Sequence, residues 1–133
     1  MENLEVIKNM YEAVASGDFP AFLGSMDSAI EWNEAENFPY ADGNPYMGPE
    51  AVAAGVFGRI AADWEYWTLS DHEYYDCNGD NIIVTGRYNA KHKITGKIIK
   101  AQFTHVWTVK NDRAIRFQQY ADTKQVADAM LEV

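Results

Sequence analysis

Two residues near the end of the chain, His105 and Asp122, have side chains that could transfer protons. The first lies in the run Phe103–Val109, and the second ends the run Ile115–Asp122. The short Lys110–Asp112 segment between them favours a tight turn, so the two runs are predicted to be antiparallel strands. An apolar setting can move the pKa of an imidazole or a carboxyl group towards neutrality. The pattern therefore indicates acid–base chemistry at this strand pair, with Asp122 and His105 as the candidate catalytic residues.

The strand face that carries His105 is rich in large side chains. His105 alternates with Phe103 and Trp107, so all three are expected on one face. A histidine there is either a satisfied core residue or part of a cavity wall. We predict a small-molecule cavity, with these ligand-binding residues: Trp32, Tyr40, Phe103, Trp107, Phe117, Gln119 and Tyr120.

Asp122 also has a structural interpretation. It directly precedes an expected final helix, and Gln125 follows three positions later, which is a typical helix N-cap arrangement. Alternation puts Asp122 on the face opposite Phe117 and Gln119, unless a bulge or the strand end turns it back. A catalytic and a capping role both stay open for this residue.

The elements before these strands are predicted from periodicity. A first helix is expected from the apolar spacing of Leu4, Ile7, Tyr11 and Val14, with Gly17 as its stop. Asp18 is expected to cap a second, short helix that reaches Met26. A short strand is expected at 30–33, and Pro49 starts a third helix with a buried stripe that includes Val52, Val56, Ile60 and Trp64.

The second half of the chain predicts strands. Asn78-Gly79 is a hairpin signal, and a further turn is expected near Thr95–Lys97. Four long strands from Trp67 to Asp122 would form a meander, followed by a helix from Thr123 to Leu131. Helices segregated from an antiparallel sheet indicate the α+β class. We predict one domain over residues 1–133, with a cone-shaped curved antiparallel sheet wrapped around helices and enclosing a pocket.

Composition limits the function classes. The formal charge is −9, which argues against nucleic acid and anionic membrane surfaces as partners. Cys77 is the only cysteine, so no intrachain disulfide is possible. There is no apolar run of membrane-spanning length and no signal-peptide pattern, so a cytoplasmic location is expected. No spacing suggests a metal site or a nucleotide loop.

Several motifs resemble those of SnoaL-like proteins. The run Tyr46–Val52 resembles the start of that family's third helix, and Phe103–Val109, Ile115–Phe117 and Tyr120–Thr123 resemble its closing strands. The family shares its cone-shaped, cystatin-like fold with nuclear transport factor 2 and ketosteroid isomerase. Ketosteroid isomerase carries a tyrosine on its first helix; Tyr11 fits a buried stripe equally well.

The resemblance implies a cofactor-independent reaction. Asp122 would stand where polyketide cyclases of the family carry an acid–base aspartate, and His105 would accompany it. The substrate would be a hydrophobic carbonyl compound, such as a polyketide or steroid-like ring system. The alternatives are a non-catalytic ligand-binding domain and a dimerisation domain. A homodimer is expected through the open sheet face, which would carry Arg87, Thr104 and Arg116.

Overall fold

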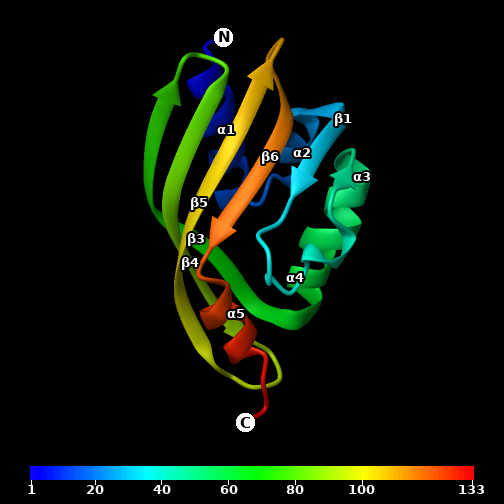
Figure 1. Ribbon diagram of the computed structural model, residues 1–133, viewed down its shortest axis with the longest axis vertical. Coiled ribbons are helices and arrows are strands. Elements are labelled where there is room, and N and C mark those ends of the chain that lie inside the picture. Colours follow the sequence, from blue (N-terminus) through cyan, green and yellow to red (C-terminus); the bar gives the residue numbers. More distant parts are fainter.

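The computed structural model describes residues 1–133 and has one curved sheet with helices at its concave side and its ends (Figure 1). The strands are β1 (Met26–Asn33), β2 (Tyr46–Met47), β3 (Trp64–Cys77), β4 (Asn81–His92), β5 (Ile98–Lys110) and β6 (Arg113–Ala121). The helices are α1 (Asn3–Ala15), α2 (Phe19–Gly24), α3 (Pro49–Val52), α4 (Gly58–Asp63) and α5 (Thr123–Ala129). A 3-10 turn spans Ala41–Gly43, and a π-helical turn, Ala53–Phe57, joins α3 to α4. The α+β prediction is confirmed.

The sheet is mixed, with the strand order β2-β1-β6-β5-β4-β3. The predicted antiparallel meander is present from β3 to β6. Asn111 and Asp112 make the last hairpin turn, and both have positive φ angles, as a two-residue turn of this kind requires. The expectation of an antiparallel sheet is wrong for one pair of strands, because β1 pairs with β6 in parallel. After the three hairpins that join β3 to β6, strand β6 lies beside β1 and runs in the same direction.

The first helix begins and ends where the sequence predicts, and the second begins after Asp18 as predicted but ends at Gly24. The stripe of α1 is buried at Ile7 and Tyr11, and Gly17, with φ of 79°, turns the chain away. Asp18 caps α2 by accepting a hydrogen bond of 3.2 Å from the Ala21 amide. Helix α5 ends at Ala129 rather than at the predicted Leu131. Two further boundaries differ from the prediction: Met26 belongs to β1, and Trp64 begins β3. Both side chains are buried nonetheless, because strand positions facing the helices fill the same core.

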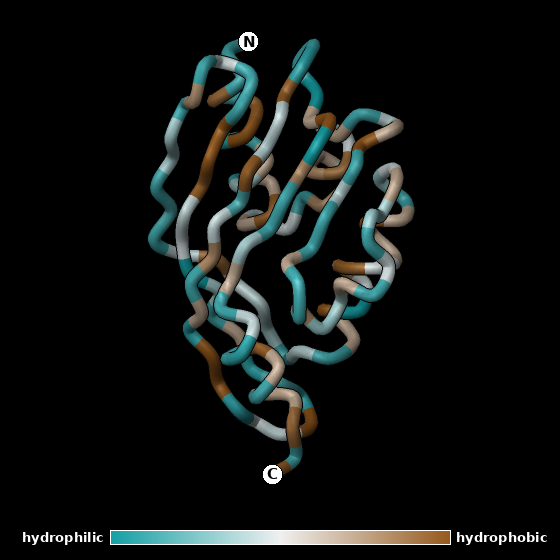
Figure 2. The backbone as a smooth tube through the Cα atoms, in the orientation of Figure 1, coloured by the Kyte–Doolittle hydropathy of each residue, from teal (hydrophilic) through white to brown (hydrophobic).

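One apolar core of 29 buried residues lies between the helices and the concave face of the sheet. Alternation is regular on β4 and β5, where every second side chain is buried from Ile82 to His92 and from Ile99 to Val109, apart from Gly86. Figure 2 shows hydrophobic stretches along the strands. No helix combines the length and hydropathy needed to cross a membrane. Arg87, Thr104 and Arg116 lie on the outer face, and the homodimer through that face stays a prediction.

Candidate functional site

A cavity of about 110 Å³ lies between the sheet and the helices. Thirteen of its sixteen lining residues are hydrophobic, so it is an apolar site with few polar groups. The groups able to make hydrogen bonds come from α1, from β1 and the segment after it, and from the four strands β3 to β6. They belong to Tyr11, Trp32, Glu34, Trp67, Tyr88, His105, Trp107 and Gln119.

His105 stands at the centre of a chain of buried hydrogen bonds. Its Nδ1 atom lies 2.5 Å from the Tyr11 hydroxyl, and its Nε2 atom lies 2.6 Å from the Tyr88 hydroxyl. The Tyr11 oxygen also accepts a bond of 2.9 Å from the Trp107 indole, and the Tyr88 oxygen accepts one of 2.7 Å from the Gln119 amide. Helix α1 and strands β4 and β5 are thus joined through one imidazole ring.

Burial sets the protonation states of this chain. It lowers the pKa of His105 well below the usual value of 6.5, and the nearby His72 lowers this pKa further. Burial likewise raises the pKa values of Tyr11 and Tyr88 well above 10.0. The imidazole is therefore neutral and both phenols keep their protons near neutral pH.

Glu34 is the acidic residue of the cavity wall. Its Oε2 atom accepts a hydrogen bond of 3.2 Å from the Trp32 indole, whereas its Oε1 atom is buried and has no protein partner. Burial raises the pKa of Glu34 to about 8, and the Trp32 bond opposes that shift. Glu34 is thus a carboxyl group that can exist in either form close to neutral pH, as a general acid or base requires.

The backbone around Glu34 is held at several points. The Asn44 side chain accepts from the Glu34 amide over 2.9 Å and donates to the Glu34 carbonyl over 2.8 Å. The Gln119 side chain accepts from the Ala35 amide over 3.0 Å, while its other end donates to Tyr88. Gln119 therefore connects the segment that carries Glu34 to the histidine chain.

Five of the predicted site residues line this cavity: Trp32, His105, Trp107, Phe117 and Gln119. Two more are buried just behind its wall. The Phe103 ring stacks on His105 with a centroid distance of 4.1 Å. The Tyr40 hydroxyl donates to Asp63 over 2.7 Å and accepts from the Trp64 indole over 3.1 Å, which ties the loop after β1 to α4 and β3.

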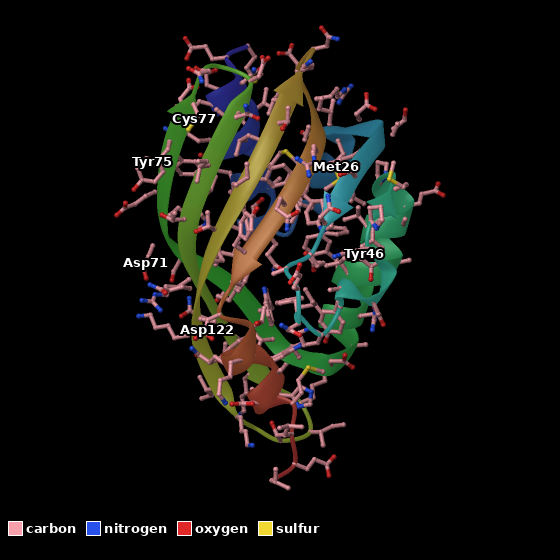
Figure 3. All side chains as sticks on the ribbon, in the orientation of Figure 1. Met26, Tyr46, Asp71, Tyr75, Cys77 and Asp122 are labelled. Atoms are coloured by element: carbon pink, nitrogen blue, oxygen red, sulfur yellow. The ribbon has the colours of Figure 1, made fainter.

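Tyr120 and Asp122 lie outside the cavity. Tyr120 is 57% exposed because it points to the outer face of β6. Asp122 is exposed at the junction of the sheet with α5, where Figure 3 labels it. Its carboxyl group accepts bonds of 3.2 Å from the Gln125 amide and 3.1 Å from the Gln125 side chain. The capping interpretation accounts for this position, and the catalytic role of Asp122 stays a prediction from the resemblance alone.

Four of the cavity residues with hydrogen-bonding groups were not among the predicted site residues, namely Tyr11, Glu34, Trp67 and Tyr88. Period-two alternation could have found Glu34, since Ile30, Trp32 and Glu34 all face inward. The same rule applies to Tyr88, which shares its face with Val84. Tyr11 belongs to the buried stripe of α1 and also lines the cavity. No group of three or more His, Cys, Asp or Glu side chains is arranged to hold a metal ion.

The cavity wall is shared with an outer groove. Four residues line both spaces: Val14, Phe57, Ile60 and Trp67. They come from α1, the π-helical turn, α4 and β3. Single side chains therefore separate the cavity from the surface on this side.

Comparison with known proteins places this fold and cavity in a family. A family model described as a SnoaL-like domain matches residues 7–117. The crystal structure of an NTF2-like protein from Burkholderia thailandensis is 30% identical, with 98% of each chain covered and a TM-score of 0.92.

Two more distant structures share the fold. TerC, co-crystallised with polyporic acid, is 22% identical, with 96% of each chain covered and a TM-score of 0.83. A candidate polyketide cyclase from Pseudomonas putida is 15% identical over 98% of this chain and 99% of its own, with a TM-score of 0.85. A search of curated proteins found no match. The match to the family model and the 30% identity over nearly the whole length show that this chain belongs to the SnoaL-like, NTF2-like family.

Proposed function

We propose that the protein binds a small hydrophobic carbonyl compound in the cavity and catalyses a cofactor-independent proton transfer, with Glu34 as the proton-carrying group. One observation carries the proposal: a buried carboxyl group with an unpartnered oxygen lines the same apolar cavity as the Tyr11–His105–Tyr88 chain. Buried polar atoms are nearly always hydrogen-bonded, so an exception in a cavity wall points to a ligand. The proposal moves the acid–base role from Asp122 to Glu34.

The reaction would be an isomerisation through an enolate. The Glu34 carboxylate takes a proton from a carbon atom next to the carbonyl group. The electron pair of the broken C–H bond forms a carbon–carbon double bond, and the carbonyl π pair moves onto the oxygen atom. A hydroxyl group of Tyr11 or Tyr88 stabilises that oxygen by donating a hydrogen bond. In a β,γ-unsaturated carbonyl compound the negative charge extends to the γ carbon, so return of the proton from Glu34 to that carbon shifts the double bond into conjugation and completes the isomerisation without any oxidation or reduction.

The relatives support a small-molecule function without fixing the reaction. Their fold hosts several unrelated activities, so the reaction must be argued from the side chains of this cavity. TerC was crystallised with polyporic acid, and the Pseudomonas putida protein carries the name of a candidate polyketide cyclase. Both names are compatible with an organic ligand in a cavity of this fold.

Hydrogen–deuterium exchange next to a carbonyl group tests the proposal directly. Cyclopentanone in heavy water would be followed by NMR at about pH 8.5, where Glu34 is largely ionised. We expect the protein to accelerate the exchange, and Glu34→Gln to reduce that acceleration by about a hundredfold or more. Asp122→Asn, the same carboxyl-to-amide change at an exposed site, is the matched control and should keep the acceleration.

Two outcomes would count against the proposal. Equal acceleration by the wild type and by Glu34→Gln would remove Glu34 from the chemistry, and loss of acceleration only in Asp122→Asn would return the role to Asp122. Binding of cyclopentanone without any exchange would favour the second function, ligand binding without catalysis. The largely apolar lining is the observation that favours this second function.

A further inference from the structure

The Tyr11–His105–Tyr88 chain has one proton more than its two internal hydrogen bonds use. Each phenol contributes one proton, and the neutral imidazole contributes a third. The contacts at Nδ1 and Nε2 each need one proton between the two heavy atoms. The bonds from Trp107 and Gln119 bring their own donors and use none of the three protons. One hydroxyl proton is therefore left without a partner in the chain, and both tyrosines line the cavity.

The tautomer of His105 decides which tyrosine presents that proton. With the imidazole proton on Nδ1, Tyr11 accepts from His105, so its own proton is free, while Tyr88 donates to Nε2. With the proton on Nε2, the roles are reversed and Tyr88 has the free proton. Either arrangement offers one donor, so a complementary ligand carries a hydrogen-bond acceptor.

Charge in the cavity selects against ionic ligands. None of the sixteen lining residues is Lys or Arg, and His105 is neutral, so no positive charge is available to pair with a carboxylate or a phosphate. The ionisable side chain that remains, Glu34, would repel an anion once it loses its proton. A cation is disfavoured as long as Glu34 keeps its proton, because the cation would then be buried without a partner in this apolar space.

The volume of the cavity limits the ligand to about one ring. An apolar protein cavity of about 150 Å³ is known to hold benzene, and this cavity has about 110 Å³. The walls come from helices α1, α2 and α4, the π-helical turn and five strands of the sheet, and they include the large rings of Trp32, Trp107 and Phe117. A multi-ring compound would have to displace at least one of these packed side chains.

We infer that the cavity selects a compact, uncharged, single-ring compound with a carbonyl-type acceptor, which receives the one free proton of the Tyr11–His105–Tyr88 chain. This inference deepens the proposed function and rests on the same cavity, but it concerns recognition and does not require turnover. It narrows the expected multi-ring substrate to a molecule of one ring.

A matched ligand series tests the charge and the size. Calorimetric titration at about pH 6, where Glu34 keeps its proton, would compare cyclopentanone with cyclopentanecarboxylate, cyclopentylammonium and the two-ring ketone 2-decalone. We expect cyclopentanone to bind, and the two ions and 2-decalone to bind at least about tenfold more weakly. Tighter binding of the carboxylate or of 2-decalone than of cyclopentanone would overturn the inference. Tighter binding of the ammonium ion would also overturn it and would indicate a cation cage of aromatic rings around Glu34.

Infrared spectroscopy tests the proton donor. At about pH 9.5, where Glu34 has lost its proton and cannot donate, the carbonyl stretch of bound cyclopentanone should still lie below its frequency in hexane, because a hydrogen bond from the tyrosine hydroxyl weakens the C=O bond. An unshifted stretch would show that no donor faces the ligand and would overturn the inference. The proposed function is judged separately by deuterium exchange: a bound, hydrogen-bonded cyclopentanone that does not exchange would contradict the reaction and leave the ligand class intact.

Discussion

The Trp32 indole donates the one hydrogen bond that the buried carboxyl group of Glu34 receives, over a distance of 3.2 Å. Buried carboxylates usually need several donors to offset the loss of water. A single indole N–H does not suffice, so burial keeps the pKa of Glu34 at about 8. The two residues lie on one inward-facing row of β1 and its extension, so this row supplies the acidic side chain of the cavity wall and its hydrogen-bond donor.

The first prediction concerns the pH dependence of stability. The pKa of Glu34 is raised from 4.5 to about 8 on folding, so its contribution to stability is fully present below pH 4.5 and is lost as the pH rises through about 8. Between about pH 5 and pH 9, this loss is on the order of 4 kcal/mol in the free energy of unfolding. Urea unfolding at a series of pH values should show that slope in the wild type.

Glu34→Gln is the matched variant for this measurement, because the amide has a similar shape and does not titrate. We expect the decrease in the free energy of unfolding between about pH 5 and pH 9 to disappear in the variant. The loss of stability at low pH should remain in the variant. The pKa of His105 is lowered on folding, so its contribution to stability is lost as the pH falls below 6.5. If Glu34→Gln still loses stability between about pH 5 and pH 9, Glu34 is not the group that causes this loss.

The fold could be predicted from the sequence largely because its signals are local. Hairpin turns such as Asn111-Asp112 and the stop at Gly17 act within a few residues, and both lie where the pattern predicts. The parallel pairing of β1 with β6 could not be predicted, because it joins segments about 85 positions apart and depends on how the whole meander curls. The boundary at Trp64 failed for a similar reason, since its spacing fits a helical stripe and a strand equally well.

The candidate site could be predicted from the sequence only in part, and the reason differs from that for the fold. Alternation places His105 and Gln119 correctly on the inner face, and both are buried. The resemblance gives Asp122 a catalytic role. Its alternation on β6 and its spacing of three residues from Gln125 predict instead the helix-capping position that the structure shows. Glu34 was missed because it lies one residue beyond β1, where the importance of an acidic side chain depends on the loop that covers it.

The second prediction assigns Asp122 a measurable structural role. Asp122→Ala removes the bond to the Gln125 amide and should lower the free energy of unfolding by about 1 kcal/mol. Binding and deuterium exchange of cyclopentanone should be unchanged, because Asp122 does not line the cavity. Chemical denaturation and NMR exchange on the same protein sample measure both effects. An exchange rate that falls with no loss of stability would contradict this assignment.

The third prediction concerns Gln119, which connects the Ala35 amide to the Tyr88 hydroxyl. Gln119→Leu leaves the amide donor without its partner and removes a donor from Tyr88, so we expect a loss of about 2 kcal/mol in the free energy of unfolding. The adjacent Gln118→Leu, on the half-buried outer face, is the control and should cost less than about 1 kcal/mol. Equal costs in the two variants would show that the bridge through Gln119 does not stabilise the site.

The fourth prediction concerns access to the cavity through Phe57, which ends the π-helical turn. Its ring lies 5.2 Å from Phe19, 5.3 Å from Phe22 and 5.7 Å from Trp32, measured between centroids. Because Phe57 lines both the cavity and the outer groove, Phe57→Ala should join the two spaces. We expect the variant to bind 2-decalone at least about tenfold more tightly than the wild type does.

Phe19→Ala provides the matched control for this variant. Phe19 lines the groove but not the cavity, so its truncation removes a similar ring without opening the inner space. The control should therefore keep the preference for cyclopentanone over 2-decalone, as measured by calorimetric titration. Truncation of a packed aromatic ring costs up to about 3 to 5 kcal/mol, so both variants are first checked for folding by circular dichroism. If folded Phe57→Ala still rejects 2-decalone, the wall that limits ligand size lies elsewhere in the cavity.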